Sequence, residues 1–452
     1  MMQSNQTFSE PAKSIPVIKK TDVIVCGAGP AGIGAALAAA RLGARVQLID
    51  VHGCLGGVWT AGLLTWIIDT YDKPGILIDL MQRLEARGAA ISRDNSRAIL
   101  HLQSQFAFGY DVEKMKVLLE EMCCEAGVDV RLHTRVVAAH CDEQKELTTI
   151  ITESKSGREA WQAKAFIDCT GEGDLAALAG CGFDYGNEKS QAQPMSLLGI
   201  IGGIDANEIA PFHRFHADAD KNTDLKRNAK QVLLEEMKRA GVTPSYEAPS
   251  LFKITDNLFT LMAHHEYGVC GMNADDVTRA TFSGRRELHQ IVAALKSLGG
   301  VWKNLHLVST AEQIGIREGR RIHGLYTVAT KDITEGARHP DAICRSHFGV
   351  DVHSTDPATN KAIAKHDYKT APYDIPLRAL IAKDVKRLLL AGRCISGNFY
   401  AHASYRVTGN AVALGQGAGV AAALSAQHHM LPQDLPWELI EAAQQKINGT
   451  MK

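Results

Sequence analysis

A glycine-rich turn near the N-terminus constrains the fold more than any other feature. An apolar, β-branched run at 21–26 predicts a buried strand, and Gly-x-Gly-x-x-Gly follows at 27–32. The Ala-rich stretch 33–42 predicts a helix, and 45–49 predicts a second strand that ends at Asp50. This order is typical of a dinucleotide-binding βαβ unit.

Each residue of this motif has a physical role in such a unit. Gly27 permits the tight turn, Gly29 lets a pyrophosphate approach the backbone, and Gly32 lets the helix pack closely on the strand. Free N–H groups at the helix N-terminus attract phosphates, and Asp50 can accept hydrogen bonds from an adenosine ribose. A second glycine-rich segment at 53–62 favours a longer cofactor than NAD, namely FAD. An ordinary glycine turn remains the alternative there.

Composition excludes several classes of protein. The chain has 452 residues, 45% of them hydrophobic, and a net charge of −1. It can therefore bury a large core, and neither a nucleic-acid partner nor a membrane partner is expected. The N-terminus lacks the pattern of a secretory signal, and no apolar stretch reaches the roughly 18 residues of a membrane span. The ten cysteines contain no Cys-x-x-Cys pair, which predicts reduced thiols in the cytoplasm and no metal site.

The remaining pattern predicts an α/β protein with a discontinuous first domain. Segments between 128 and 163 predict an antiparallel meander, and 165–168 predicts a separate buried strand. Charged helices at 224–240 and 275–298 then alternate with strands near 251–260 and 305–311, without a new glycine motif. We therefore predict a Rossmann-like FAD-binding domain, with a parallel sheet plus an antiparallel meander, and an inserted α+β substrate domain. The predicted boundaries are a flexible tail at 1–17, the FAD-binding domain at 18–190 and 373–430, a substrate or cap region at 191–372, and a C-terminal extension at 431–452.

Several motif blocks together resemble one family. The chain is similar to the FAD-dependent oxidoreductases of the glutathione-reductase-like superfamily, and within it to the bacterial family often mislabelled xanthan lyase. The blocks are 27–32 with Asp50, Leu55-Gly56-Gly57, 166–176, Gln193-Pro194-Met195, 317–322, 373–376 and 389–423. The absence of iron–sulfur cysteine motifs and of a second nucleotide motif disfavours the heterodisulfide-reductase and disulfide-reductase branches.

The resemblance implies where FAD binds, without a covalent bond. Asp50 replaces a more usual Glu beside the ribose, and the backbone of Val136 meets adenine. Gly392 and Arg393 lie beside the ribityl chain, and a helix start at 417–419 faces the pyrimidine end of the flavin. The implied cofactor-binding residues are Gly27, Gly29, Pro30, Ala31, Gly32, Asp50, Gly56, Gly57, Val136, Thr170, Gly171, Gly392, Arg393, Gly417, Ala418 and Gly419.

The predicted catalytic residues lie between the last two glycine-rich blocks. His402 is the candidate base, because an ordinary imidazole titrates near neutral pH. Arg406 is expected to hold a substrate carboxylate or a flavin carbonyl, and Tyr405 to orient a hydroxyl. Weaker candidates are His347, His353, and one of the adjacent His264 and His265. The cluster Arg317, Arg320 and Arg321 either attracts an acidic substrate or forms structural salt bridges.

The expected function is oxidation of a small polar metabolite by hydride transfer to flavin N5, as a dehydrogenase or oxidase with an unassigned electron acceptor. One alternative is a flavin monooxygenase that uses NAD(P)H and oxygen. Another is a non-redox flavin-binding protein or a lyase, although aromatic residues make up only 6% of the chain. The expected partner is a small-molecule substrate, and a homo-oligomer is left open.

Overall fold

The computed structural model describes residues 7–91, 107–213, 229–364 and 366–449, and it contains the predicted βαβ unit. Strand β1 (Val17–Cys26) leads into helix α1 (Pro30–Arg41), and β2 (Val46–Ile49) returns parallel to β1. Helix α1 begins earlier than predicted because Pro30 is well suited to a first helical position. Of the predicted tail 1–17, residues 7–16 have no regular structure, Val17 opens β1, and 1–6 lie outside the described residues.

One seven-stranded sheet combines the parallel strands with the meander, in the order β6-β2-β1-β9-β8-β7, with β18 also paired to β9. The further members are β6 (Asp129–Arg131), β7 (Arg135–Cys141), β8 (Leu147–Ser154), β9 (Gly157–Asp168) and β18 (Leu388–Leu390). The separate strands predicted at 159–163 and 165–168 form one strand, β9, which is antiparallel to β8 and parallel to β1 and β18. The predicted α/β class is confirmed.

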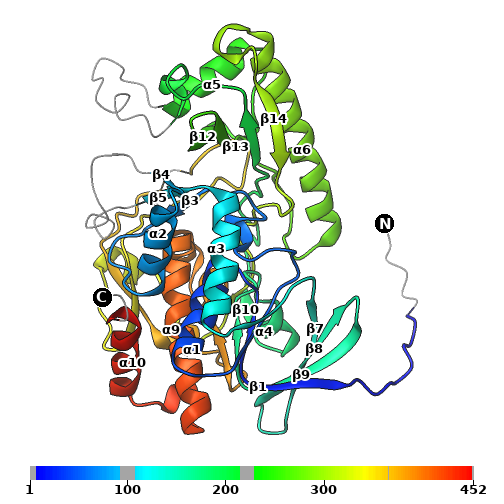
Figure 1. Cartoon of the computed structure of the whole chain (residues 1–452), viewed down its shortest axis with the longest axis vertical. Coiled ribbons are helices and arrows are strands. Elements are labelled where there is room, and N and C mark those ends of the chain that lie inside the picture. The colour runs from blue at the N-terminus through cyan, green and yellow to red at the C-terminus, as the bar shows by residue number, and fades with distance from the viewer. Residues whose placement is uncertain (1–6, 92–106, 214–228, 365, 450–452) are drawn as a thin grey trace.

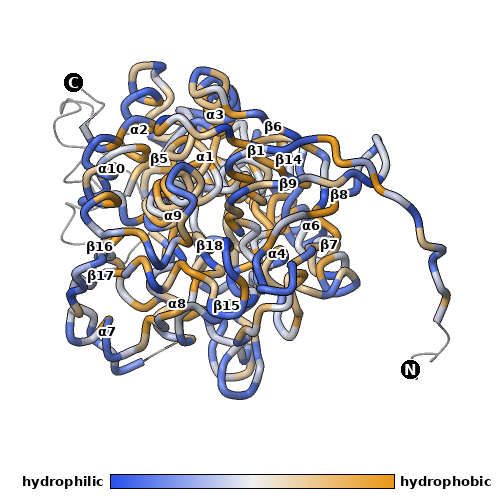
Figure 2. The backbone as a smooth tube through the Cα atoms, turned by 90° about the horizontal axis from the view of Figure 1, so that it is seen from below, coloured by the Kyte–Doolittle hydropathy of each residue, from blue (hydrophilic) through white to orange (hydrophobic). Residues whose placement is uncertain are grey.

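Helices α1 and α9 (Thr408–His428) pack against each other at backbone distance (Figure 1). A Cβ atom added to Gly415 would lie 2.0 Å from the carbonyl oxygen of Ala31, and one added to Gly419 would lie 2.2 Å from that of Ala35. The glycines of α9 therefore allow helix–helix contact. Figure 2 shows hydrophobic stretches concentrated around α1, α9 and the parallel strands, with hydrophilic stretches toward the periphery.

A second hydrophobic core lies at the upper end of the molecule in Figure 1. Its antiparallel sheet has the order β12-β13-β11-β14 and packs with α5 and α6. The predicted strand near 251–260 is a hairpin, because a two-residue turn separates β12 from β13. The members are β11 (Gly199–Gly202), β12 (Ser250–Thr255), β13 (Leu258–Met262), β14 (His306–Thr310), α5 (Ala229–Arg239) and α6 (Ala274–Ser297). Of the predicted helix 224–240, residues 224–228 lie outside the described part.

The two cores show where the chain passes between units. Apart from Leu63 and Val112, the buried members of the second core lie between Met195 and Ile314. Ile322 already belongs to the larger core, so the chain returns to it well before the predicted boundary at 372. Helix α10 (Trp437–Gly449) also packs into the larger core, although 431–452 was predicted as a separate extension.

The other elements are short or peripheral. No single helix among the described residues is long and apolar enough to span a membrane; α8 (Phe399–Tyr405) and α9 are so only as a pair, with a bend of 94° between them. The elements are α2 (Ile76–Ala86), α3 (Val112–Glu125), α4 (Asp174–Leu178), α7 (Thr330–Glu335), α8 (Phe399–Tyr405), β3 (Trp66–Ile68), β4 (Ala90–Ile91), β5 (Ala107–Tyr110), β10 (Phe183–Asp184), β15 (Arg321–Ile322), β16 (Ala342–Ser346) and β17 (Tyr373–Pro376).

Candidate functional site

The three glycines of the first turn are required for different reasons. A Cβ on Gly27 would lie 2.4 Å from the carbonyl oxygen of Cys169, and one on Gly32 would lie 1.8 Å from that of Gly27. Packing of the turn therefore demands both. A Cβ on Gly29 would meet nothing within 4 Å. Gly29 is also the N-cap of α1 and offers no side-chain cap, so the first N–H groups of the helix are available to an anion.

Asp50 and the second glycine loop hold this turn in place. The buried Asp50 carboxylate accepts hydrogen bonds from the N–H of Ala28 and, at 2.7 Å, from that of His52. The Gly56 N–H donates to the carbonyl of Ala28 at 2.8 Å, and a Cβ on Gly57 would lie 3.0 Å from Gly29 Cα. The two predicted glycine segments therefore lie directly against each other.

Arg393 connects the turn after β18 to the turn after β9. Its guanidinium forms an ion pair with Glu172 and lies where a side chain on Gly171 would be. The Thr170 hydroxyl donates to the buried Asp168 carboxylate at 2.7 Å and so stabilises the same turn. All these residues follow the carboxyl ends of parallel strands, where ligands bind in open α/β sheets. Val136 pairs with Thr152 in the meander, and its contact with adenine stays a prediction.

Several buried polar atoms around these turns have no hydrogen-bond partner among the described residues. Leaving such atoms without a partner costs free energy, so a polar ligand that bonds to them would stabilise the arrangement. They include N–H and O–H groups that can donate hydrogen bonds to a phosphate, ribityl or flavin oxygen. The atoms are Trp59 Nε1, Gln313 Oε1, Arg393 Nε, Arg406 Nε, Thr408 Oγ1 and both ring nitrogens of His402. This donor set fits a long polar cofactor.

The helix start predicted at 417–419 is wrong, because α9 begins nine residues earlier, at Thr408. Gly417, Ala418 and Gly419 are buried inside the helix. A Cβ on Gly417 would lie 2.1 Å from the side chain of Ile343, and Gly419 faces α1. The first turn of α9 lacks a side-chain cap, and the adjacent Thr408 hydroxyl is unpaired. Thr408 therefore has the features that the prediction assigned to 417–419.

The predicted catalytic residues on α8 differ in their surroundings. His402 is fully buried, and burial together with Arg321, Arg406 and Arg393 holds its pKa well below the ordinary value. Tyr405 is also fully buried, and its hydroxyl donates to the carbonyl of Ile395 at 3.0 Å. That internal bond contradicts the predicted role of Tyr405 in orienting a substrate hydroxyl.

Arg406 connects the end of α8 to Asp351 and to Gln193, which in turn holds His353, a weaker candidate from the sequence. Its Nη2 donates to the backbone carbonyl of Asp351 at 2.7 Å and lies 3.6 Å from the Asp351 carboxylate. The Gln193 side-chain oxygen accepts from the same nitrogen at 3.4 Å and from the N–H of His353 at 2.9 Å. Arg406 thus lies beside an acid and a histidine as well as beside the start of α9.

His353 and His265 bring the two cores into contact. His353 Nδ1 lies 3.1 Å from His265 Nε2, and His353 Nε2 lies 3.3 Å from the Asp351 carboxylate. Burial, followed by the positive charge of Arg317, lowers the pKa of His353 to about 3 and that of His265 well below its ordinary value. Tyr246 stacks against His265 at 4.1 Å between ring centroids. Both histidines are therefore neutral at pH 7.

The three clustered arginines have different partners. Arg320 pairs with Asp174 at 2.9 Å and Arg321 with Glu318 at 2.5 Å, as structural salt bridges. Arg317 donates only to neutral oxygens, the Pro194 carbonyl and the Ser196 hydroxyl, both at 2.8 Å. Within the described ranges no carboxylate forms an ion pair with it. Burial and the nearby Arg406 lower its pKa to about 10.

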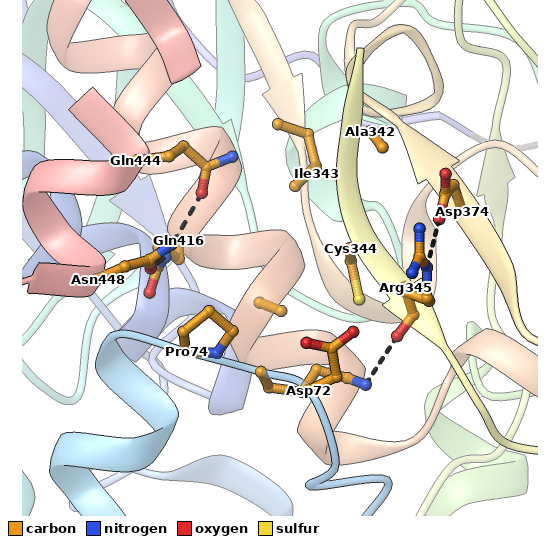
Figure 3. Close-up of a pocket in the computed structure, with 12 residues that line it drawn as sticks. Asp72, Pro74, Ala342, Ile343, Cys344, Arg345, Asp374, Gln416, Gln444 and Asn448 are labelled. Carbon is orange, nitrogen blue, oxygen red and sulfur yellow. Dashed lines mark hydrogen bonds and ion pairs between the residues drawn. The ribbon is translucent and has the colours of Figure 1, made fainter. Parts of the chain in front are cut away.

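A separate polar cavity of about 260 Å³ lies between α9, α10 and β16 (Figure 3). Gln416 donates to Asn448 at 2.9 Å on one side, and Arg345 pairs with Asp374 at 2.9 Å on the other. These groups satisfy one another and none is a predicted site residue, so we assign no ligand to this cavity. No group of three or more His, Cys, Asp or Glu in the described part is arranged to hold a metal.

Comparison with known proteins identifies the cofactor. The family model described as FAD dependent oxidoreductase matches residues 22–447, nearly the whole chain. The chain belongs to this family. FAD is therefore its cofactor. A curated relative, an uncharacterized protein in the nifH2 5′ region of Methanosarcina barkeri, is 29% identical over 164 residues, which are 34% of this chain and 85% of the relative.

Solved structures resemble this member of the family at the level of fold. A geranylgeranyl bacteriochlorophyll reductase-like protein from Thermoplasma acidophilum is 12% identical with a TM-score of 0.45, covering 95% of this chain and 83% of its own. A p-nitrophenol 4-monooxygenase from Pseudomonas putida is 11% identical with a TM-score of 0.45, covering 94% and 84%. Likeness of this degree assigns no reaction to this oxidoreductase.

Proposed function

We propose that this FAD-dependent oxidoreductase is a dehydrogenase or oxidase that removes a hydride and a proton from a small polar metabolite. The observation that carries the proposal is the contact between Arg406, which precedes α9, and the acid–histidine group formed by Asp351 and the buried His353 and His265. Oxidation of an alcohol or amine requires a group that takes the O–H or N–H proton.

The geometry of the turns supports the following cofactor-binding roles. Gly29 and the start of α1 would hold the pyrophosphate, and Asp50 the ribose. Arg393 would lie beside the ribityl chain, and Thr408 with the first turn of α9 beside the pyrimidine end of the flavin. When bound, FAD supplies the two-electron acceptor, which takes a hydride at N5.

Residues of the protein accept the substrate proton and orient the substrate. His353 is neutral at pH 7, and the Asp351 carboxylate beside it would stabilise the ring once it takes up a proton. His402 lies among three arginines and has no carboxylate partner within the described residues. We therefore favour His353 over His402 as the proton acceptor, and assign His402 a hydrogen bond to the cofactor.

The test is anaerobic reduction of the purified, FAD-loaded protein. Panels of small alcohols, hydroxy acids and amines are mixed with it, and loss of the visible flavin absorbance is followed by stopped flow. Bleaching by one of these classes supports the proposal. Rapid bleaching by NAD(P)H together with none by any organic substrate would overturn it in favour of a monooxygenase. His353→Gln is expected to slow bleaching more than His402→Ala, and the reverse order would return the base role to His402.

A further inference from the structure

Four side chains form one continuous hydrogen-bonded chain between the two cores. Tyr267 and His265 follow β13 in the second unit, whereas His353 and Asp351 lie between β16 and β17 in the larger unit. The Tyr267 hydroxyl lies 3.2 Å from His265 Nδ1, and the next links are 3.1 Å to His353 and 3.3 Å to Asp351. The Tyr267 hydroxyl also lies 3.2 Å from the carbonyl oxygen of Ser245.

This chain has two fully bonded states that differ by one proton. In the first, Tyr267 donates to His265, His265 donates to His353, and His353 donates to the ionised Asp351. In the second, Tyr267 donates instead to the Ser245 carbonyl, which leaves His265 Nδ1 free to donate to Tyr267. His353 then carries both ring protons and donates to His265 and to Asp351. One proton added at Tyr267 converts the first state into the second by one transfer from Tyr267 to His265 and one from His265 to His353, while His353 keeps its bond to Asp351.

The charged groups differ between the two ends of the chain. At the His353 end, Arg317 and Arg406 face the carboxylate of Asp351, while Glu318 is paired with Arg321. Glu247 and Glu287 act on Tyr267 at the other end. Arg317 is held by the Pro194 carbonyl and the Ser196 hydroxyl, and among the described residues it has no acidic partner. A partly buried guanidinium that has no carboxylate partner can still form strong paired hydrogen bonds, so an anion bound beside Arg317 would stabilise the site.

We propose that the substrate is a small hydroxy acid whose carboxylate pairs with Arg317 and whose hydroxyl proton enters the chain at Tyr267 and comes to rest on His353. This inference rests on the proposed function. The reaction balances: the carbon-bound hydrogen leaves with two electrons to FAD, the O–H proton passes to the chain, and the alcohol carbon becomes a ketone or aldehyde.

The bound carboxylate also prepares the proton acceptor. Among the charged groups, Arg317 lowers the pKa of His353 most. Arg406 also lowers it, whereas Asp351 raises it. His265 faces the other ring nitrogen and is itself held neutral by burial and by Arg317. An anion on Arg317 cancels much of its field, so the pKa of His353 rises when substrate binds. A neutral alcohol would produce no such rise.

The test measures binding and proton uptake without turnover. Oxalate has carboxylates but no oxidisable C–H bond, and it is titrated into the oxidised, FAD-loaded enzyme at pH 7 in two buffers of different ionisation enthalpy. Calorimetry then gives the dissociation constant and the protons taken up. Wild type is expected to bind oxalate with uptake of up to about one proton. Arg317→Gln should weaken binding by about tenfold or more, and Arg317→Lys should weaken it less.

Matched variants distinguish loss of the Arg317 charge from loss of the folded structure. Arg320→Gln removes a neighbouring arginine that is paired with Asp174, and it should leave oxalate affinity unchanged. His353→Gln should still bind oxalate but lose the proton uptake. The visible flavin spectrum of each variant reports that the holoenzyme is folded. Absence of oxalate binding by wild type, equal binding by Arg317→Gln, or uptake that survives His353→Gln would overturn the inference.

The outcomes also distinguish this inference from the proposed function. Oxalate binding with His353-dependent uptake, but no flavin bleaching by any hydroxy acid or other organic substrate, would refute the oxidation while the anion site stands. Bleaching by neutral alcohols or amines together with no oxalate binding would support the oxidation and refute the hydroxy-acid substrate.

Discussion

Replacing Gly29 by Ala separates cofactor binding from folding, because this glycine is the one in the first turn that packing does not require. An added Cβ meets nothing within 4 Å, and the backbone angles, φ −67° and ψ −175°, suit any residue. We expect the free energy of unfolding of the apoprotein to change by no more than about 0.5 kcal/mol.

The same methyl group would occupy the space in which the pyrophosphate approaches the backbone. Forcing an extra methyl into a close contact costs about 1–3 kcal/mol. At about 1.4 kcal/mol for each factor of ten, the dissociation constant of FAD should rise roughly 5- to 150-fold. Titration of apoprotein with FAD, followed by quenching of flavin fluorescence, gives this constant, and thermal unfolding of the apoprotein gives the stability.

Gly32→Ala provides the contrast, because its Cβ would lie 1.8 Å from the carbonyl oxygen of Gly27. That variant should lose both stability and FAD binding. The reasoning is refuted if Gly29→Ala binds FAD as tightly as wild type, since the open space would then not be the pyrophosphate site. It is equally refuted if Gly29→Ala destabilises the apoprotein as much as Gly32→Ala does.

Three further changes test the packing and the buried charges. Gly415→Ala should lower the free energy of unfolding by about 1–3 kcal/mol in urea, because its Cβ would lie 2.0 Å from a carbonyl of α1; Gly449→Ala, with nothing within 4 Å, is the control. Lys73→Met should cost about 3–5 kcal/mol, because it leaves the fully buried Asp69 without its cation; a stable variant would contradict this. The pKa of His353, about 3 in the folded protein, lies below its unfolded value, so the unfolded chain binds more protons and stability falls as pH drops from about 6.5 toward 3. His353→Gln should flatten that fall, and an unchanged slope in urea titrations between these pH values would contradict it.

The local parts of the fold were predictable, because their signals lie within short stretches of sequence. The turn at 27–32 and the strands on either side of it form a contiguous unit, and the structure contains it. The helix start predicted at 417–419 was wrong because a small residue in this part of the chain serves two purposes, approach of a ligand and approach of another helix. Only the position of the partner, α1, distinguishes them, and the sequence does not contain that information. The continuity of β9 was likewise hidden, because its two halves pair with different strands.

Only the parts of the candidate site that lie in local motifs were predictable from the sequence. Arg406 and the cofactor turns belong to recognisable motifs. His265 and His353 are 88 positions apart and come from different cores, so no local pattern pairs them. The adjacent histidines 264 and 265 indicated that one of the two side chains lines a pocket. They did not indicate which of the two it is. The distinction between Arg317 and its neighbours depends on where Asp174 and Glu318 lie in space.

The backbone contact between α1 and α9 has a consequence for how such an enzyme diversifies. Helix α1 begins at the glycine turn that we propose binds the pyrophosphate, and α9 begins at Thr408, which we propose lies beside the pyrimidine end of the flavin. Because glycine removes the side chains between them, the spacing of these two helix starts is set by main-chain atoms. The residues that set this spacing lie outside 195–314. If the second core holds the substrate as proposed, side chains there could be replaced to accept a different substrate while the two helix starts keep their distance.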